Sequence, residues 1–414
     1  MPIGDISLQR AFYGSPLRHP VVGRTIVAVL LFTILLGISI SLLNLFVNVL
    51  QGLEVYLTAQ TLVILTSLPA LAVLWYLDRR ERESIWVFLG LLLWGAWIAA
   101  AYALLLNTTG GLVLVQAMND DVTLKAEIES EGVDVADIGD IIVAWLIAPP
   151  VEEIMKGLGI LLIFWLLRSE FDGVRDGIIY GGLIGLGFNM MESVQYIMAG
   201  YAAVGYAPYL EQIAVRFVFL GFDGHLLYSA LFGAGIGLAL QTRRAWLKIL
   251  APVGGLSLGI LAHFINNSLT AVFFILLLQA FGVEVEAEAA LEGIPLFLVW
   301  FCYAFATIVT QFPFYFLIAL ALIFSGQWEQ KVIRKELEEE IGRSITPMEY
   351  ELLLRESLFG LRTVPDFPGP TARAIVNAQN ELAFRKWRVL HEGNDPELDH
   401  LVHAWRADIA RLRA

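Results

Sequence analysis

Long runs of apolar residues, separated by short polar segments, dominate this chain of 414 residues. A helix that crosses a bilayer needs roughly 20 predominantly apolar residues. Runs of this length predict about eight membrane-spanning helices, at residues 25–50, 57–77, 85–107, 138–167, 177–200, 213–240, 249–280 and 294–325. The pattern therefore predicts an all-α, polytopic membrane protein.

The polar segments divide the chain into five parts. These are a short N-terminal segment (1–24), the first three spans with an acidic outside loop at 108–137 (25–137), spans four to seven (138–280), an outside loop with the eighth span (281–325) and a tail (326–414). In the tail, Thr346-Pro347 followed by Glu349 is typical of a helix start. We expect a small water-soluble helical tail that binds a partner or a second copy of the chain, or else supports the protein at the membrane surface.

Composition and charge predict where the protein lies. With 57% hydrophobic and 16% charged residues, the chain is not a soluble globule. Of its 27 lysines and arginines, 24 fall in segments on one side of the predicted membrane, and such an excess marks the cytoplasmic side. Both termini are therefore predicted to be cytoplasmic, in a multi-pass protein of the cell membrane. The net charge of −13 disfavours nucleic acid as a partner. The acidic outside loop is a solvated face or, alternatively, an electrostatic filter for substrate.

Ionisable and amide side chains interrupt four consecutive spans. They are Glu152, Glu153 and Lys156 in the fourth span, Asn189 and Glu192 in the fifth, Asp223 and His225 in the sixth, and His263, Asn266 and Asn267 in the seventh. Such groups are costly in a bilayer and usually face a polar cavity. Counted from the ends of the spans, the four groups lie within roughly one or two helical turns of the midplane. This common depth predicts that they form a single site.

Prolines and glycines in these spans predict how they pack. Pro149 and Pro150 should kink the fourth span and leave carbonyl groups free to line a wet cavity. Small-residue steps predict close helix contacts in spans five to seven. These steps are Gly177/Gly181/Gly185, Gly233/Gly237 and Gly255/Gly259. Asp223 is expected to support its neighbours, and Arg216 to extend its side chain to the outer interface.

Two hydrolytic chemistries fit the clustered side chains, and the first uses a metal. Glu192, His225 and His263 would bind one Zn²⁺ that keeps an open position. A glutamate of the fourth span would then be the general base, with Glu152 the first candidate and Glu153 the second.

The second chemistry uses no metal. A glutamate and a histidine would deprotonate a water directly, while another histidine, together with Asn267, would stabilise the oxyanion. Lys156 can pair with the glutamate that precedes it by four positions, Glu152. Each of these side chains also has a structural alternative, as an ion-pair partner of Lys156, a hydrogen bond between helices or a neutral histidine of the core.

Four short motifs in successive spans resemble those of a known family. They are Glu152-Glu153-x-x-Lys156, Phe188-x-x-x-Glu192, His225 at the start of a glycine-rich stretch, and His263-x-x-x-Asn267. They resemble the PrsW family of intramembrane proteases and, more distantly, the CAAX prenyl protease and bacteriocin-processing superfamily. The resemblance covers roughly residues 140–280. PrsW-like proteins are commonly classed as metalloproteases and the CAAX relatives are argued to use glutamate without metal, so both chemistries stay open.

The resemblance implies an intramembrane endopeptidase of the bacterial inner membrane. Its substrate would be a membrane-anchored, single-pass protein of the anti-sigma-factor kind, cut in the membrane or at its outer edge. Carried over residue by residue, Glu152 and Glu153 match the glutamate pair, and Lys156, Glu192, His225, His263 and Asn267 match the other motif positions. Besides this substrate, the expected partner is membrane lipid.

Two other functions fit the same residues. Carboxylates and histidines at the midplane also serve as proton relays, which would make the protein a proton- or cation-coupled transporter. Broken helices in two corresponding positions would support a transporter, and the sequence predicts one break, at Pro149-Pro150. The third function is a membrane scaffold that has lost catalysis.

Overall fold

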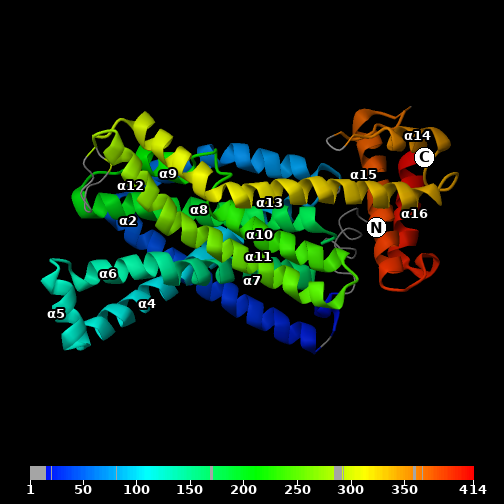
Figure 1. Cartoon of the computed structure of the whole chain (residues 1–414). Helices are drawn as coiled ribbons and strands as arrows, with labels where there is room; N and C mark the ends of the chain where they lie inside the picture. The colour runs from blue at the N-terminus through cyan, green and yellow to red at the C-terminus, as the bar shows by residue number, and fades with distance from the viewer. Residues whose placement is uncertain are drawn as a thin grey trace.

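The computed structural model describes residues 15–19, 21–80, 82–167, 171–283, 291, 293–357, 360–365 and 367–414. Across these residues the chain is helical, apart from a single β-bridge between Ile341 and Ile345. Figure 1 shows a long helical bundle, an arm made of α4, α5 and α6 that projects from one end, and a separate group of helices, α14 to α16, at the other end. The all-α prediction is confirmed.

The first two predicted spans are the two halves of α2, which are separated by a non-helical residue. After the 3-10 turn η1 (Pro16–Arg18), α2 runs over Val22–Leu77 and leaves helical geometry at Gly52. Gly52 lies beside Tyr201, in the last turn of α8 (Val174–Val204). Two helices meet at Gly52, so the predicted break between residues 50 and 57 is present there, and the turn η2 (Asp78–Arg80) follows the second of them.

The predicted acidic outside loop is largely helical. The third span, α3 (Ile85–Leu93), passes through the π-helix η3 (Trp94–Ala99) into α4 (Ala100–Asp120). Two short helices follow, α5 (Val122–Ser130) and α6 (Val135–Ile142). The acidic residues themselves explain these helices, because Asp121 and Asp134 accept hydrogen bonds from the first backbone N–H groups of α5 and α6.

The predicted sixth span, 213–240, is not one helix. It is divided into α9 (Tyr209–Arg216) and α10 (His225–Gln241). In the connecting segment Leu220, Gly221 and Gly224 have positive φ angles of 57°, 87° and 63°, which an α-helix does not contain. Asp223 accepts hydrogen bonds from the backbone N–H groups of Val218 and Phe219 and so closes this turn. As a result, His225 is the first residue of α10.

The remaining helices complete the bundle. The fourth span continues from α6 through the π-helix η4 (Val143–Ile147) into α7 (Ala148–Leu166). The seventh comprises α11 (Ala245–Ile265), the π-helix η5 (Asn266–Thr270) and α12 (Ala271–Ala280). The eighth, α13 (Leu296–Glu338), has 43 residues and enters the tail without a break, a length of about 65 Å.

Four helical runs of the described chain are long and apolar enough to cross a membrane. They are Val22–Arg80, Ile85–Asp120, Ala245–Ala280 and Leu296–Glu338, while α10 is apolar but shorter. The protein is therefore a membrane protein by the composition of its helices. Eight spans and cytoplasmic termini stay predictions.

Glycines bring α8, α10 and α11 into backbone contact, as the small-residue steps predict. A methyl group added to Gly181 would lie 2.2 Å from the carbonyl oxygen of Ser229, and one added to Gly185 would lie 2.1 Å from that of His225. A methyl group on Gly259 would lie 2.6 Å from the carbonyl oxygen of Tyr228. Because no side chain fits there, the three helices that carry Glu192, His225 and His263 lie closer together than ordinary helix pairs.

The C-terminal unit, residues 326–414, packs around its own apolar core. It contains the end of α13, then α14 (Pro347–Leu354), α15 (Gly369–His391), the turn η6 (Pro396–Leu398) and α16 (His400–Arg413). The predicted helix start at Thr346 is confirmed, since Thr346 and Glu349 exchange capping hydrogen bonds. Leu337, Leu382 and Val402 are fully buried in the core of the unit.

Buried ion pairs join this unit to the bundle. Arg80, at the end of α2, pairs with Glu329 of α13 at 3.2 Å and with Glu356 at 3.5 Å. Arg175 of α8 also pairs with Glu329, at 2.9 Å. Arg388 of α15 pairs with Asp172, just before α8. The unit is therefore held against one end of the membrane helices by charged contacts.

Candidate active site

The clustered polar side chains of spans four to seven meet in one place. Glu152, Glu153 and Lys156 come from α7, Glu192 from α8, His225 from the start of α10, and His263 from the last turn of α11. Glu192 is partly exposed, and each of the other five is at most 5% exposed. The convergence predicted from their depth is thus present in the structure.

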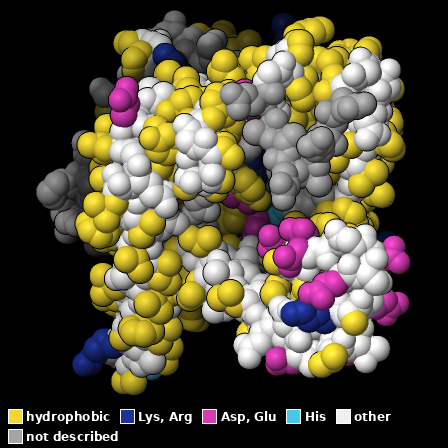
Figure 2. Space-filling view, turned by 90° about the vertical axis from the view of Figure 1, so that its left-hand side faces the viewer, with side chains coloured by type: hydrophobic (Ala, Val, Ile, Leu, Met, Phe, Trp, Pro, Cys, Tyr) yellow, Lys and Arg dark blue, Asp and Glu magenta, His cyan; other side chains and the backbone are white. Residues whose placement is uncertain are grey.

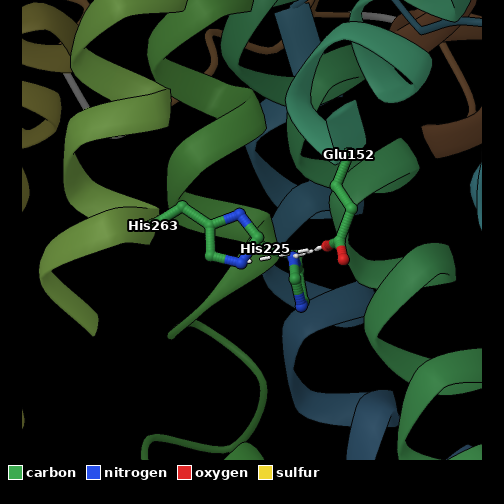
Figure 3. A group of neighbouring side chains, drawn as sticks. All are labelled: Glu152, His225 and His263. Atoms are coloured by element: carbon green, nitrogen blue, oxygen red, sulfur yellow. Dashed lines mark ion pairs between the residues drawn. The ribbon is translucent and has the colours of Figure 1, made fainter. Parts of the chain in front are cut away.

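Three atoms from three helices define the centre of this cluster. Oε2 of Glu152 lies 3.8 Å from Nδ1 of His225 and 3.8 Å from Nε2 of His263 (Figure 3). The three ligand-type atoms all lie within 4.8 Å of one another. The other oxygen of Glu152 accepts a hydrogen bond from Asn107 of α4 at 3.0 Å, whereas Oε2 is buried without a hydrogen-bond partner in the described residues.

Two further carboxylates hold the outer nitrogens of the histidine rings. Nε2 of His225 lies 2.6 Å from Glu192, and Nδ1 of His263 lies 3.0 Å from Glu153. Each carboxylate favours a proton on the nitrogen that it contacts, so the nitrogens nearest to Glu152 keep their lone pairs. Carboxylates that hold a histidine in this way are typical partners of metal-binding and catalytic histidines.

The sequence-based ligand set placed Glu192 with the two histidines. In the structure Glu192 lies behind His225, on the ring nitrogen that points away from His263, and Glu152 occupies the position between the two rings. Glu153 also accepts a hydrogen bond from Ser229, at 3.3 Å. The two adjacent glutamates of α7 therefore have different surroundings.

Lys156 is fully buried between two of these groups. Its Nζ atom lies 2.5 Å from Glu153 and 2.7 Å from Nδ1 of His225. The same ammonium group lies 4.3 Å from the centre of the Phe188 ring, a distance that permits a cation–π interaction. Lys156 thus balances the charge of Glu153 and contacts the inner nitrogen of His225. Its partner is Glu153, three positions before it, and not Glu152.

Arg216, which we expected to extend to the outer interface, belongs to the site. Its guanidinium donates to Glu192 at 2.9 Å and lies over the ring of Tyr196 at 4.1 Å. Asn189 donates to the backbone carbonyl of Arg216 at 3.0 Å. Arg216 therefore fixes the carboxylate that orients His225. An arginine within a predicted span was the sequence signal for this role.

Asn267 bonds to the π-helix that precedes the two glutamates. Pro149 has no N–H group, and one turn before it the side chain of Asn267 donates to the carbonyl oxygen of Ala144 at 2.9 Å. The contact joins the π-helices η4 and η5, and such local widening is frequent at functional sites. The Ala144 carbonyl is thus occupied by a side chain, and the kink with free carbonyls at Pro149 and Pro150 stays a prediction. Asn267 also lines the cavity beside the histidines.

Tyr228 and Asn107 were missed by the sequence analysis. The ring of Tyr228 stacks on His263 at 4.9 Å between ring centres and 17° between planes. It restricts the rotation of that imidazole. Asn107 holds Glu152 from the end of the third predicted span. Nothing in a single sequence marks either residue, because tyrosine and asparagine are common at the ends of membrane helices.

A cavity of about 290 Å³ leads to the cluster. Its walls include His225, His263, Glu192, Arg216 and Asn267. Viewed from the end of the molecule that carries the arm α4–α6, acidic and histidine side chains are visible at the bottom of a hollow (Figure 2). The polar cluster is thus reached from that end of the bundle.

Comparisons with known proteins agree with this arrangement. The family model described as PrsW family intramembrane metalloprotease matches residues 83–308, more than half of the chain and all of the groups described above. A protein named Protease PrsW from Geobacillus kaustophilus (strain HTA426) is 29% identical over 114 residues, which are 26% of this chain and 46% of that protein. The chain thus spans about half the length of this curated relative. No solved structure matches the chain.

Proposed function

Because this chain belongs to the PrsW family of intramembrane metalloproteases, we propose that it hydrolyses a peptide bond of a membrane-anchored protein at the centre formed by Glu152, His225 and His263. One observation carries the proposal. A buried carboxylate oxygen without a partner faces two imidazole nitrogens from two other helices, each at 3.8 Å. Buried polar atoms are normally paired, so an unpaired one among ligand-type atoms favours a third group that binds all three.

The donor set fits a divalent metal such as Zn²⁺. Two histidines and one carboxylate are a known catalytic zinc set, and here the outer nitrogen of each histidine is held by a carboxylate. We therefore propose Glu152, His225 and His263 as the ligands, with Glu192 as an orienting group. A bound metal would polarise the scissile carbonyl and make a water more acidic.

The side chains around this set would keep it in place. Glu153 and Glu192 would fix the two imidazole rings, and Arg216 would fix Glu192 in turn. Asn267 would hold the start of α7 through Ala144, and thereby the backbone from which Glu152 projects. Such preorganisation is a general requirement of hydrolytic centres.

One contact favours the metal-free chemistry as a second candidate. Nζ of Lys156 lies 2.7 Å from the same nitrogen of His225 that a metal would use. In this version the Glu152 carboxylate removes a proton from water while the water oxygen bonds to the carbonyl carbon. The proton then passes to the leaving nitrogen as the C–N bond breaks, and the amide group of Asn267 donates to the oxyanion.

The cavity supports a membrane-anchored substrate. It opens toward the end of the bundle that carries the acidic arm, which the distribution of lysines and arginines predicts to be the outer side. We therefore propose cleavage of a single-pass protein at or near the outer edge of the membrane, in the manner of regulated anti-sigma-factor proteolysis. The protein would lie in the bacterial cell membrane with both termini in the cytoplasm.

The test uses the purified full chain in proteoliposomes with a panel of single-pass proteins. Wild type, Glu152→Gln and His263→Ala are compared with Glu54→Gln, which changes an exposed glutamate of α2 far from the cluster. We expect cleavage by wild type and Glu54→Gln alone. Cleavage by Glu152→Gln at the wild-type rate would overturn the proposal.

Metal content separates the two chemistries. For the metal-dependent version we expect about one zinc per chain by elemental analysis, loss of cleavage on chelation and recovery on readdition of zinc. Cleavage that survives complete metal removal would leave only the metal-free version.

A further inference from the structure

A second cavity, at the opposite ends of α10 and α11 from His225 and His263, lies where the membrane helices meet the C-terminal unit. Its volume is about 360 Å³. The walls come from the ends of α7 and α10, the start of α11, and α15 of the C-terminal unit. The cavity is therefore at the boundary between the apolar helices and the polar unit, and its two ends differ in character.

The end between the membrane helices is apolar. Leu161 and Phe164 come from the last turns of α7, Ile236 and Leu240 from the last turns of α10, and Pro252 from the second turn of α11. None of these side chains offers a hydrogen-bonding group. This part of the cavity therefore suits a hydrocarbon chain.

The end next to α15 is basic and aromatic. Lys248 of α11 lines it, is exposed, and has no hydrogen bond or ion pair with the residues that the structure describes. Arg243 donates to His391 at 3.4 Å. His391 in turn stacks on Trp387 at 4.8 Å. Tryptophan at such a boundary is typical of membrane interfaces.

The charges that line the cavity balance formally, with Lys248 and Arg388 against Asp172 and Glu392, and Arg243 beside them adds one positive charge. Asp172 lines the cavity but is paired with Arg388, and Glu392 is exposed at the edge. Burial, followed by the charges of Arg243 and Lys248, lowers the pKa of His391. Burial is the larger cause, and the two cations act in the same direction.

We propose that this cavity binds the phosphate-bearing headgroup of an anionic phospholipid, with Lys248 on the phosphate and the start of one acyl chain between α7 and α10. Basic pockets between membrane helices are typical sites for such headgroups. A free phosphate ion carries the same kind of charge as the headgroup but has no hydrocarbon chain to bury in the apolar end. The lipid would bridge the C-terminal unit and the two helices, α10 and α11, whose far ends carry His225 and His263.

The test is retention of lipid by the purified full chain in native mass spectrometry. Protein in mild detergent is exchanged into an equimolar mixture of phosphatidylglycerol and phosphatidylcholine. We expect one phosphatidylglycerol per chain and an about fivefold lower retained fraction in Lys248→Gln. Lys331→Gln is the matched control, because Lys331 is an exposed lysine of the C-terminal unit that does not line the cavity.

A further arm separates lipid from free anion. Millimolar inorganic phosphate should not displace the retained phosphatidylglycerol, because only the lipid fills the apolar end. The proposal fails if Lys248→Gln retains as much lipid as Lys331→Gln, if phosphatidylcholine is retained equally, or if inorganic phosphate replaces the lipid. Because no cleavage is measured, these outcomes do not depend on the proposed hydrolysis.

Discussion

Two buried clusters of charge can be compared in this molecule, the histidine–glutamate centre and the junction with the C-terminal unit. At the junction, Glu329 accepts from Ser325 at one oxygen and from Arg80 at the other, which also forms an ion pair with Arg175. Glu356 pairs with Arg80 and Arg362. At the centre, one oxygen of Glu152 accepts no hydrogen bond from the described residues and lies next to two ring nitrogens. Buried charge is common to both clusters, and a buried carboxylate oxygen that faces two ring nitrogens without a hydrogen bond distinguishes the centre.

The largest expected effect concerns the centre. Replacing Glu152 with glutamine keeps the shape of the side chain and removes its charge. We expect the cleavage rate to fall by about 10²- to 10⁴-fold, the usual contribution of such a group, while the melting temperature changes little. Initial rates with a cleaved single-pass protein measure the first quantity and thermal unfolding the second. If Glu152→Gln unfolded at a much lower temperature but cleaved normally, Glu152 would be a structural residue like those of the junction.

The junction should show the opposite pattern. Glu329→Gln leaves Arg80 and Arg175 buried without their shared carboxylate, and removal of one partner of a buried pair costs about 3–5 kcal/mol. We expect a lower thermal midpoint and faster proteolysis of the C-terminal unit, with cleavage per folded molecule retained. Glu351→Gln is the control, because Glu351 is an exposed glutamate of the same unit. Equal midpoints for the two variants would contradict the role of the junction.

Arg216 tests whether a paired charge within the centre affects catalysis, as Glu152 does, or stability, as the paired charges of the junction do. Arg216→Gln removes the donor that holds Glu192, and loss of such a supporting partner typically costs about 10- to 100-fold in activity or metal affinity. We expect kcat to fall with little change in KM, and Arg216→Lys to recover part of the loss. An unchanged kcat in Arg216→Gln would show that Glu192 orients His225 without help.

The smallest expected effect is that of low pH on the stability of the C-terminal unit. Burial opposes ionisation of Glu340, Glu349 and Asp399, but hydrogen bonds from arginines outweigh it and lower their pKa values. Hydrogen bonds from Arg406 lower the pKa of Glu397 to about 2. Glu336, whose pKa is raised by burial, acts in the opposite direction.

Lowered carboxyl pKa values stabilise the fold above the unfolded pKa of about 4.3, and this stabilisation is lost as the pH falls through the folded values. We therefore expect hydrogen exchange in α15 and α16 to be slow at neutral pH and faster at about pH 3. Slower hydrogen exchange in α15 and α16 at about pH 3 than at neutral pH would contradict this prediction.

The sequence predicted the helical fold and the convergence of the polar groups, because both depend on periodicity and depth. It did not predict the break between α9 and α10, since the connecting residues are as apolar as a span and the turn depends on Asp223 and on positive φ angles. The helical arm was also missed, because acidic residues suit both loops and helix caps.

Within the site, the sequence could not assign atoms to partners. Glu152 and Glu153 are neighbours, and about 100° of helical rotation separates their directions. Only the packing of α7 against α10 and α11 determines which of them lies between the histidines. The pairing of Arg216 with Glu192 likewise depends on the position of α9, which no periodicity reveals.

Because α13 is continuous, it fixes the distance and the rotation between the bundle and the C-terminal unit. Gln311 donates to the carbonyl oxygen of Ala262 in the bundle, and Glu329 pairs with Arg80 and Arg175 at the junction. The two positions are eighteen residues apart, which is about five complete turns, so both face the same side. Deleting one residue between them would turn Glu329 by about 100° away from its arginines. The number of residues between Gln311 and Glu329 can therefore change only by whole helical turns if Glu329 is to keep its ion pairs with Arg80 and Arg175.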